Sequence, residues 1–150
     1  MIPRVSTEIR PFRPQDQAAV KALVLAGLVD HWGWLDPTLN PDLNDIFLSY
    51  AAGCFLTAWQ ADQLVGCGAL KPHGAHSGEI VRMSVAKHLR RGGIGRQVLQ
   101  ALLAEARRRC YRTVILETTE TWQEVVAFYL SCGFQITHHM DGDVYFRLEL

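Results

Sequence analysis

A glycine-rich turn between two strongly patterned segments constrains the fold of this chain most. Residues 79–85 alternate as a half-buried strand does, with Glu79, Val81, Met83 and Val85 expected on one face. Residues 94–106 repeat apolar side chains at helical spacing, which predicts an amphipathic helix. The turn at residues 90–96 therefore predicts a strand, turn and helix unit of the kind from which α/β proteins are built.

The same turn has the chemistry of a phosphate cradle. Gly92, Gly93 and Gly95 allow main-chain N–H groups to approach an anion, and the start of the helix adds the positive end of its dipole. Arginines in and around the turn can pair with further phosphate oxygens. The Rossmann spacing fails because Val98 stands at the third glycine position, and the Walker spacing fails because no lysine and hydroxyl follow the last glycine. An ordinary tight turn is the alternative.

The composition limits the class of protein. The chain has 150 residues, 49% of them hydrophobic and 20% charged, which predicts one globular domain over residues 1–150. Its formal net charge of zero argues against nucleic acid or an anionic membrane as a partner. The four cysteines are scattered without metal-ligand spacing, so we expect no metal site. No segment approaches the roughly 20 apolar residues of a membrane span, and we expect a cytoplasmic protein.

The charged residues are divided between two parts of the chain. Residues 22–70 contain no Lys or Arg and five Asp, whereas residues 82–112 contain nine basic residues and one Glu. Such a division suits an anionic ligand on one part and a cationic ligand on the other, with two solvated charged faces as the alternative.

The patterning predicts a mixed order of strands and helices. The expected strands cover residues 8–10, 54–59, 64–70, 79–85, 114–116, 134–137 and 144–148, and the expected helices cover residues 14–28, 42–51, 94–106 and 121–131. Thr121 and Glu124 have the spacing of a capping box for the last helix, and Gly133 is expected to end it. Residues 31–44 favour an irregular loop.

At this point the chain resembles the GCN5-related N-acetyltransferases (GNAT family). The family signature Gln/Arg-x-x-Gly-x-Gly/Ala is met by Arg90, Gly93 and Gly95, after a strand and at the start of a helix. A second motif is met by Phe128-Tyr129 and Gly133-Phe134. The resemblance implies an α/β (α+β) fold with a mixed, mostly antiparallel sheet of six to seven strands and about four helices. It also implies a central parallel pair of strands, splayed to bind acyl-CoA.

The resemblance further implies acetyl-CoA as cosubstrate. Backbone N–H groups from Arg91 to Arg96 would hold the pyrophosphate, main-chain groups of Met83 and Val85 would bind the pantetheine arm, and an N–H near Val85 would stabilise the oxyanion. The full expected cofactor set is Met83, Ser84, Val85, Arg90, Arg91, Gly92, Gly93, Ile94, Gly95 and Arg96.

Two proton transfers need side chains. Tyr129 resembles the family tyrosine that protonates the departing thiolate. Glu79 is the candidate base that takes a proton from the amine through water, and Glu117 is the reserve candidate. Many family members carry an Asn that contacts the cofactor seven residues before the tyrosine; this chain has Trp122 there, which we expect to pack on apolar surface.

The acceptor is expected near the segment that joins the first two helices. A small cationic amine would be held by a carboxylate such as Asp36 or Asp42 and by the rings of Trp32 or Trp34. Tryptophans that only fix the loop to the core are the alternative. Three function classes stay open: an N-acetyltransferase of a small amine or amino-acid derivative, with a protein N-terminus or lysine as the rival acceptor; a non-catalytic acyl-CoA binding module; and a nucleotide-binding regulator. Dimers are common in the family, and no residue here identifies an interface.

Overall fold

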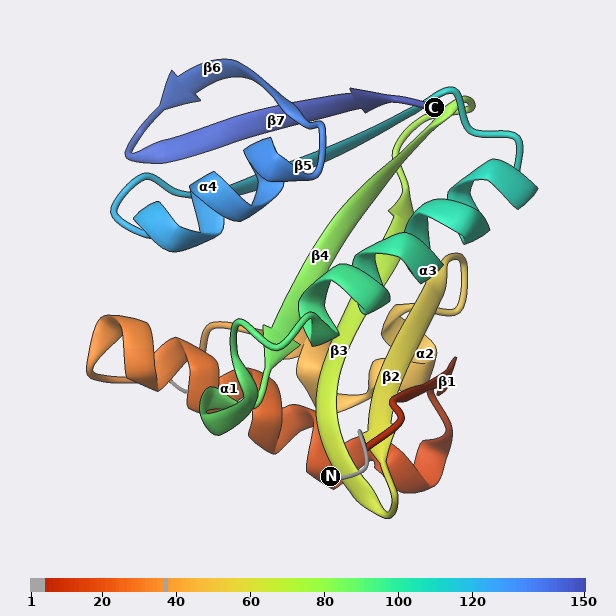
Figure 1. The fold of residues 1–150 in the computed structure, drawn as a ribbon, viewed down its shortest axis with the longest axis vertical. Coiled ribbons are helices and arrows are strands. Elements are labelled where there is room, and N and C mark those ends of the chain that lie inside the picture. The colour runs from red at the N-terminus through yellow and green to blue at the C-terminus, as the bar shows by residue number, and fades with distance from the viewer. Residues whose placement is uncertain (1–4, 37) are drawn as a thin grey trace.

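The computed structural model describes residues 5–36 and 38–150 and contains one seven-stranded sheet in the order β1-β2-β3-β4-β5-β7-β6 (Figure 1). The strands are β1 (Glu8–Pro11), β2 (Cys54–Gln60), β3 (Gln63–Pro72), β4 (Ser77–Val85), β5 (Thr113–Thr119), β6 (Gln135–Met140) and β7 (Asp143–Glu149). The helices are η1 (Pro14–Asp16), α1 (Gln17–Trp32), η2 (Pro41–Asn44), α2 (Ile46–Ser49), η3 (Lys87–Leu89), α3 (Ile94–Arg108) and α4 (Gln123–Ser131). This order of strands and α-helices is the predicted one. No helix in the described part of the chain is long and apolar enough to span a membrane.

The first helix extends further than the sequence predicted. It runs to Trp32 and ends at Gly33, whose φ of 79° places it in the left-handed region and whose N–H donates to the carbonyl of Val29. Glycine adopts this conformation without a Cβ penalty, so Gly33 is the stop signal that the prediction missed. The expected loop therefore begins after Gly33.

The predicted capping box at α4 is wrong. Trp122 occupies the N-cap position, and no side chain there caps the helix. The hydroxyl of Thr121 instead lies 3.4 Å from Nε2 of His31, and the Glu124 carboxylate pairs with Arg91. Thr121 and Glu124 thus make tertiary contacts instead of capping the helix. The predicted helix end is confirmed, since Gly133 follows the last turn with a φ of 95°.

Two pairs of consecutive strands form hairpins. The strands β2 and β3 pair antiparallel up to Gln60 and Gln63, and β6 and β7 pair up to Met140 and Asp143. Asp141 and Gly142 between the last two strands both have positive φ, 52° and 83°, as a tight two-residue hairpin turn requires.

Two apolar clusters hold the sheet from opposite sides. The larger cluster joins α3 and Tyr129 of α4 to one face. The smaller cluster joins α1, η2 and α2 to the other face over β2, β3 and β4. We call these the α3 face and the α1 face of the sheet.

A bulge in β4 interrupts the expected alternation of residues 79–85. Val81 and Ser84 pair with Ala69 and Cys67, so the register shifts between these pairs and two β4 residues oppose Gly68. One of them, Arg82, has a φ of 58°. Val81 consequently packs with the α1 face, whereas Met83 packs with the α3 face. The prediction that Glu79, Val81, Met83 and Val85 share one face is therefore wrong.

The parallel pair β4 and β5 lies at the centre of the sheet, as predicted. The two strands pair only from Ser77–Thr113 to Glu79–Ile115. Beyond these pairs they diverge, which Figure 1 shows as the widening gap between β4 and the layer of β5 and β7. The remaining six residues of β4 therefore have no β5 partner on that side.

Candidate active site

A cleft of about 690 Å³ opens where β4 and β5 diverge. Its walls come from α1, β4, the turn after η3, the start of α3, the end of β5, and α4. Nine of the ten expected cofactor residues line it, Gly92 being the exception, and Tyr129 lines it too. Sequence segments more than forty residues apart thus meet at one site.

The glycine turn presents unpaired main-chain donors to this cleft. Gly93 is the N-cap of α3 with a φ of 90°, and no side chain caps the helix there. The N–H of Gln97 is already bonded to the Gly93 carbonyl at 3.0 Å, so the free donors are those of the preceding first turn. An anion placed before α3 would meet these N–H groups and the positive end of the helix dipole.

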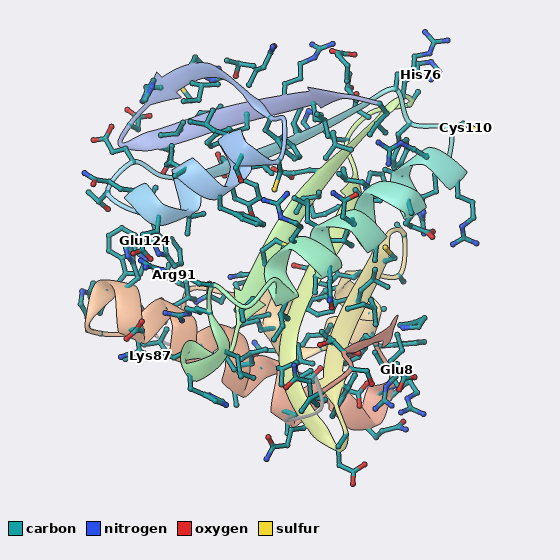
Figure 2. All side chains as sticks on the ribbon, in the orientation of Figure 1. Glu8, His76, Lys87, Arg91, Cys110 and Glu124 are labelled. Atoms are coloured by element: carbon teal, nitrogen blue, oxygen red, sulfur yellow. The ribbon has the colours of Figure 1, made fainter. Side chains whose placement is uncertain are left out.

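The arginines of the turn are partly engaged with other side chains. Arg90 donates to Asp30 of α1 at 2.8 Å and to the Val85 carbonyl at 3.3 Å. Hydrogen bonds from Lys87 first, and from Arg90, hold the pKa of Asp30 below its usual value. Arg91 pairs with Glu124 across the cleft mouth, and Figure 2 shows the two side chains reaching toward each other from the turn and from α4.

Arg96 completes this group of cations. Its Nη2 donates to the Ser131 hydroxyl at 3.1 Å, and its guanidinium lies 5.9 Å from the centre of the Phe128 ring. Arg91 and Arg96 are exposed at the mouth, where a phosphate can compete for them, whereas Arg90 joins α1 to the end of β4.

The unpaired edge of β4 is the second main-chain feature of the cleft. Met83, Ser84 and Val85 line it, and none of them pairs with β5; Ser84 and Val85 pair with β3 on their other side. An extended ligand can therefore add to this edge as a further strand would.

Tyr129 lies at the α3 face side of the cleft. Its ring packs against Phe134 and Phe146, each with a centroid distance of 5.7 Å. Burial strongly raises the pKa of Tyr129, and the neighbouring Cys132 thiol adds to the rise. The phenol therefore stays protonated at neutral pH.

The two candidate bases occupy different positions. Glu79 lies outside the cleft lining, and its carboxylate is 3.7 Å from Nζ of Lys71. Glu117 lines the cleft. Because its neighbour Leu116 is in the core on the α3 face, Glu117 points toward the α1 side. It stands opposite Tyr145 of β7, and its carboxylate raises the pKa of that phenol.

Trp122 has a role that the sequence did not predict. Its ring stacks on His31 of α1 with centroids 4.3 Å apart and an interplanar angle of 15°, and it lines the cleft. We expected packing on apolar surface, and the structure shows in addition a stack on an imidazole ring. A stack between residues 91 positions apart leaves no local sequence signal, since it forms only when α1 and α4 meet.

The expected acceptor residues do not gather at the cleft. Trp32 and Trp34 are 51% and 66% exposed and, like Asp36, do not line it. The structure therefore does not bring these tryptophans into the cleft that holds the expected cofactor residues. Asp36 accepts bonds from Thr38 within the loop, and those bonds lower its pKa. Asp42 is paired with Arg82, which lines the cleft and was missed.

In the described part of the chain, no three His, Cys, Asp or Glu side chains are placed to hold a metal ion.

Comparison with known proteins decides the family. A family model described as acetyltransferase (GNAT) family matches residues 21–134. This chain belongs to the GNAT acetyltransferase family. The uncharacterized N-acetyltransferase YsnE of Bacillus subtilis (strain 168) is similar, with 43% identity over 84 residues that cover 54% of this GNAT chain and 55% of YsnE. The chain spans about half the length of the curated relatives it matches.

Solved structures of GNAT proteins share the fold. A GNAT acetyltransferase from Staphylococcus aureus Mu50 has a TM-score of 0.87 at 18% identity over 97% of this chain and 99% of that one. The PaiA N-acetyltransferase from Thermoplasma acidophilum, solved with coenzyme A, has a TM-score of 0.85 at 18% identity over the same shares. The expected GNAT fold with its central parallel pair is therefore confirmed.

Proposed function

We propose that this protein is an acetyl-CoA-dependent N-acetyltransferase whose acceptor is a primary amine of a small molecule or amino-acid derivative. The observation that carries the proposal is the cleft between β4 and β5, which has the glycine turn at its mouth and Tyr129 in its wall. Four free cysteines suit a reducing compartment, and we extend the proposal to the cytoplasm.

The residues present fit acetyl-CoA as cosubstrate. The free N–H groups before Gln97 suit the pyrophosphate, and exposed Arg91 and Arg96 supply compensating charge. The unpaired edge of Met83 to Val85 suits the amide groups of the pantetheine arm. That the PaiA neighbour was solved with coenzyme A supports the same assignment.

The reaction follows from the groups around the cleft. The lone pair of a neutral amine attacks the thioester carbonyl, and a main-chain N–H of the β4 edge stabilises the resulting oxyanion. The carbon–sulfur bond then breaks, and the hydroxyl of Tyr129 donates its proton to the leaving thiolate. Glu117 receives the proton of the amine through water, because it lines the cleft and Glu79 does not.

A discontinuous assay with a library of amines tests the proposal. Acetyl-CoA should release free thiol with at least one primary amine, and acetyl-CoA should raise Tm more than ATP or NAD does. Protein N-termini and lysine peptides belong in the same library as the rival acceptor class. Stabilisation by acetyl-CoA without thiol release from any amine or peptide would instead indicate a binding module.

A further inference from the structure

Arg82 is held in the cleft wall by a network that crosses from β4 to η2. Its Nε donates to Oδ2 of Asp42 at 3.0 Å, and its Nη2 donates to Oδ1 at 2.6 Å. The same Nη2 donates to Oδ1 of Asn40 at 3.1 Å. Asp42 also accepts from the Tyr50 hydroxyl at 2.6 Å. Hydrogen bonds through Nε and Nη2 thus hold one edge of the planar guanidinium in place.

The network leaves one part of the guanidinium without a partner. Nη1 has no hydrogen bond to any group in the part of the chain that the structure describes. The Arg82 side chain is 20% exposed, and the residue lines the cleft. A guanidinium already fixed on one side loses little freedom when its other side binds a ligand.

The ionisation of the network keeps this donor charged. Burial acts to raise the pKa of Asp42, but hydrogen bonds from Arg82 and Tyr50 leave it below its usual value. Burial likewise opposes the charge on Arg82, and Asp42 more than offsets that effect, so the pKa of Arg82 is raised. Both partners are therefore ionised at neutral pH.

The position of Arg82 separates it from the phosphate site. It precedes Met83 on β4, whereas the glycine turn follows Val85, and three residues of strand span about 10 Å. Its contacts with η2 place the side chain on the α1 side, which is also the side toward which Glu117 points. Arg82 and Glu117 thus border the same part of the cleft from opposite strands.

We propose that the acceptor amine carries a carboxylate, and that Nη1 of Arg82 binds this carboxylate while the amine faces Glu117. This inference rests on the proposed N-acetyltransferase function and specifies its substrate class as amino acids and related amino carboxylates. A cationic acceptor held by Asp42 is disfavoured, because Arg82 and Tyr50 already occupy both oxygens of that carboxylate.

Matched pairs of acceptors test the inference. Initial rates are measured for a panel of amino acids and for their carboxamides, and kcat/KM is expressed as an acid-to-amide ratio for each pair. The Arg82→Gln variant should lower this ratio about tenfold or more, because it removes a charge-assisted hydrogen bond. Intrinsic differences between the two amines cancel when ratios of variant and wild type are compared.

Two further variants control for folding and for loss of positive charge. Arg147→Gln removes an exposed arginine of β7 that pairs with Glu149 outside the cleft, and it should leave the ratio unchanged. Asp42→Asn keeps Arg82 and removes the opposing charge, so the ratio should rise. This second variant decides the matter if Arg82→Gln does not fold.

The outcomes are distinct from those of the function test. An unchanged ratio in Arg82→Gln, a ratio in Asp42→Asn no higher than in wild type, or transfer to amines without preference for a carboxylate overturns the inference alone. An absence of thiol release with every amine overturns the proposed function on which it rests.

Discussion

The donor end and the acceptor end of the cleft are built in different ways. The donor end that we propose consists of residues 83–96, which are continuous in the chain and offer mainly main-chain groups to the cleft. The acceptor end that we propose brings together Arg82, Asp42 and Glu117 from β4, η2 and β5, and it offers side chains. A continuous main-chain site tolerates many side chains, whereas a site assembled from separate elements changes with a single substitution. In this proposal the donor end carries what the GNAT family shares, and the acceptor end sets the substrate of this chain.

The largest expected effect is that of substituting Tyr129, which belongs to neither the donor end nor the acceptor end. Tyr129→Phe should lower kcat by about 10²–10⁴-fold, the usual contribution of general acid catalysis, while the Kd for coenzyme A changes little. Single-turnover thiol release and calorimetric binding of coenzyme A separate these two quantities. Equal losses of binding and turnover would show that the phenol only supports the core.

The next largest effect compares the two carboxylates. Glu117→Gln should lower kcat/KM about 10²-fold, because it removes the base that lines the cleft, and Glu79→Gln should have a much smaller effect. Turnover with one fixed acceptor measures both variants. A larger loss in Glu79→Gln would identify Glu79 as the base and contradict the assignment of this role to Glu117.

A smaller effect is expected at the donor end. Gly93→Val should weaken binding of coenzyme A about tenfold, because a β-branched residue resists the φ of 90° and the turn would relax away from the phosphate. Gly74→Val is the matched control, since Gly74 has a φ of 75°, open space around its Cβ position, and a place outside the cleft lining. Weaker binding in the control as well would attribute the loss to general destabilisation.

The smallest effect should come from the loop after α1. Trp34→Ala combined with Asp36→Ala should leave the acceptor KM unchanged within about twofold, because these exposed side chains do not line the cleft and surface substitutions usually have small effects. Steady-state kinetics across the amine panel measure it. A marked rise in KM would place the acceptor on that loop.

The contrast between the ends also explains what the sequence could predict. The glycine turn, the patterned strand and helix, and the pair Phe128-Tyr129 are local signals, and they predicted the order of elements and most of the residues that line the cleft near the turn. The bulge at Arg82 places the β4 side chains after it on the faces opposite to those predicted, because an inserted residue interrupts the two-residue alternation of a strand. The stack of Trp122 on His31 and the pairing of Arg82 with Asp42 need the tertiary fold, so these contacts could not be predicted from the sequence.

The short pairing between β4 and β5 has a consequence for the stiffness of the protein. Three residue pairs connect the two parts of the sheet, and beyond them the backbone ladder is interrupted. A molecule bound between the two strands would bridge this interruption and stiffen the sheet there. Amide hydrogens of β5 and β7 should therefore exchange with deuterium more slowly when coenzyme A is bound, whereas those of β2 and β3 should change little.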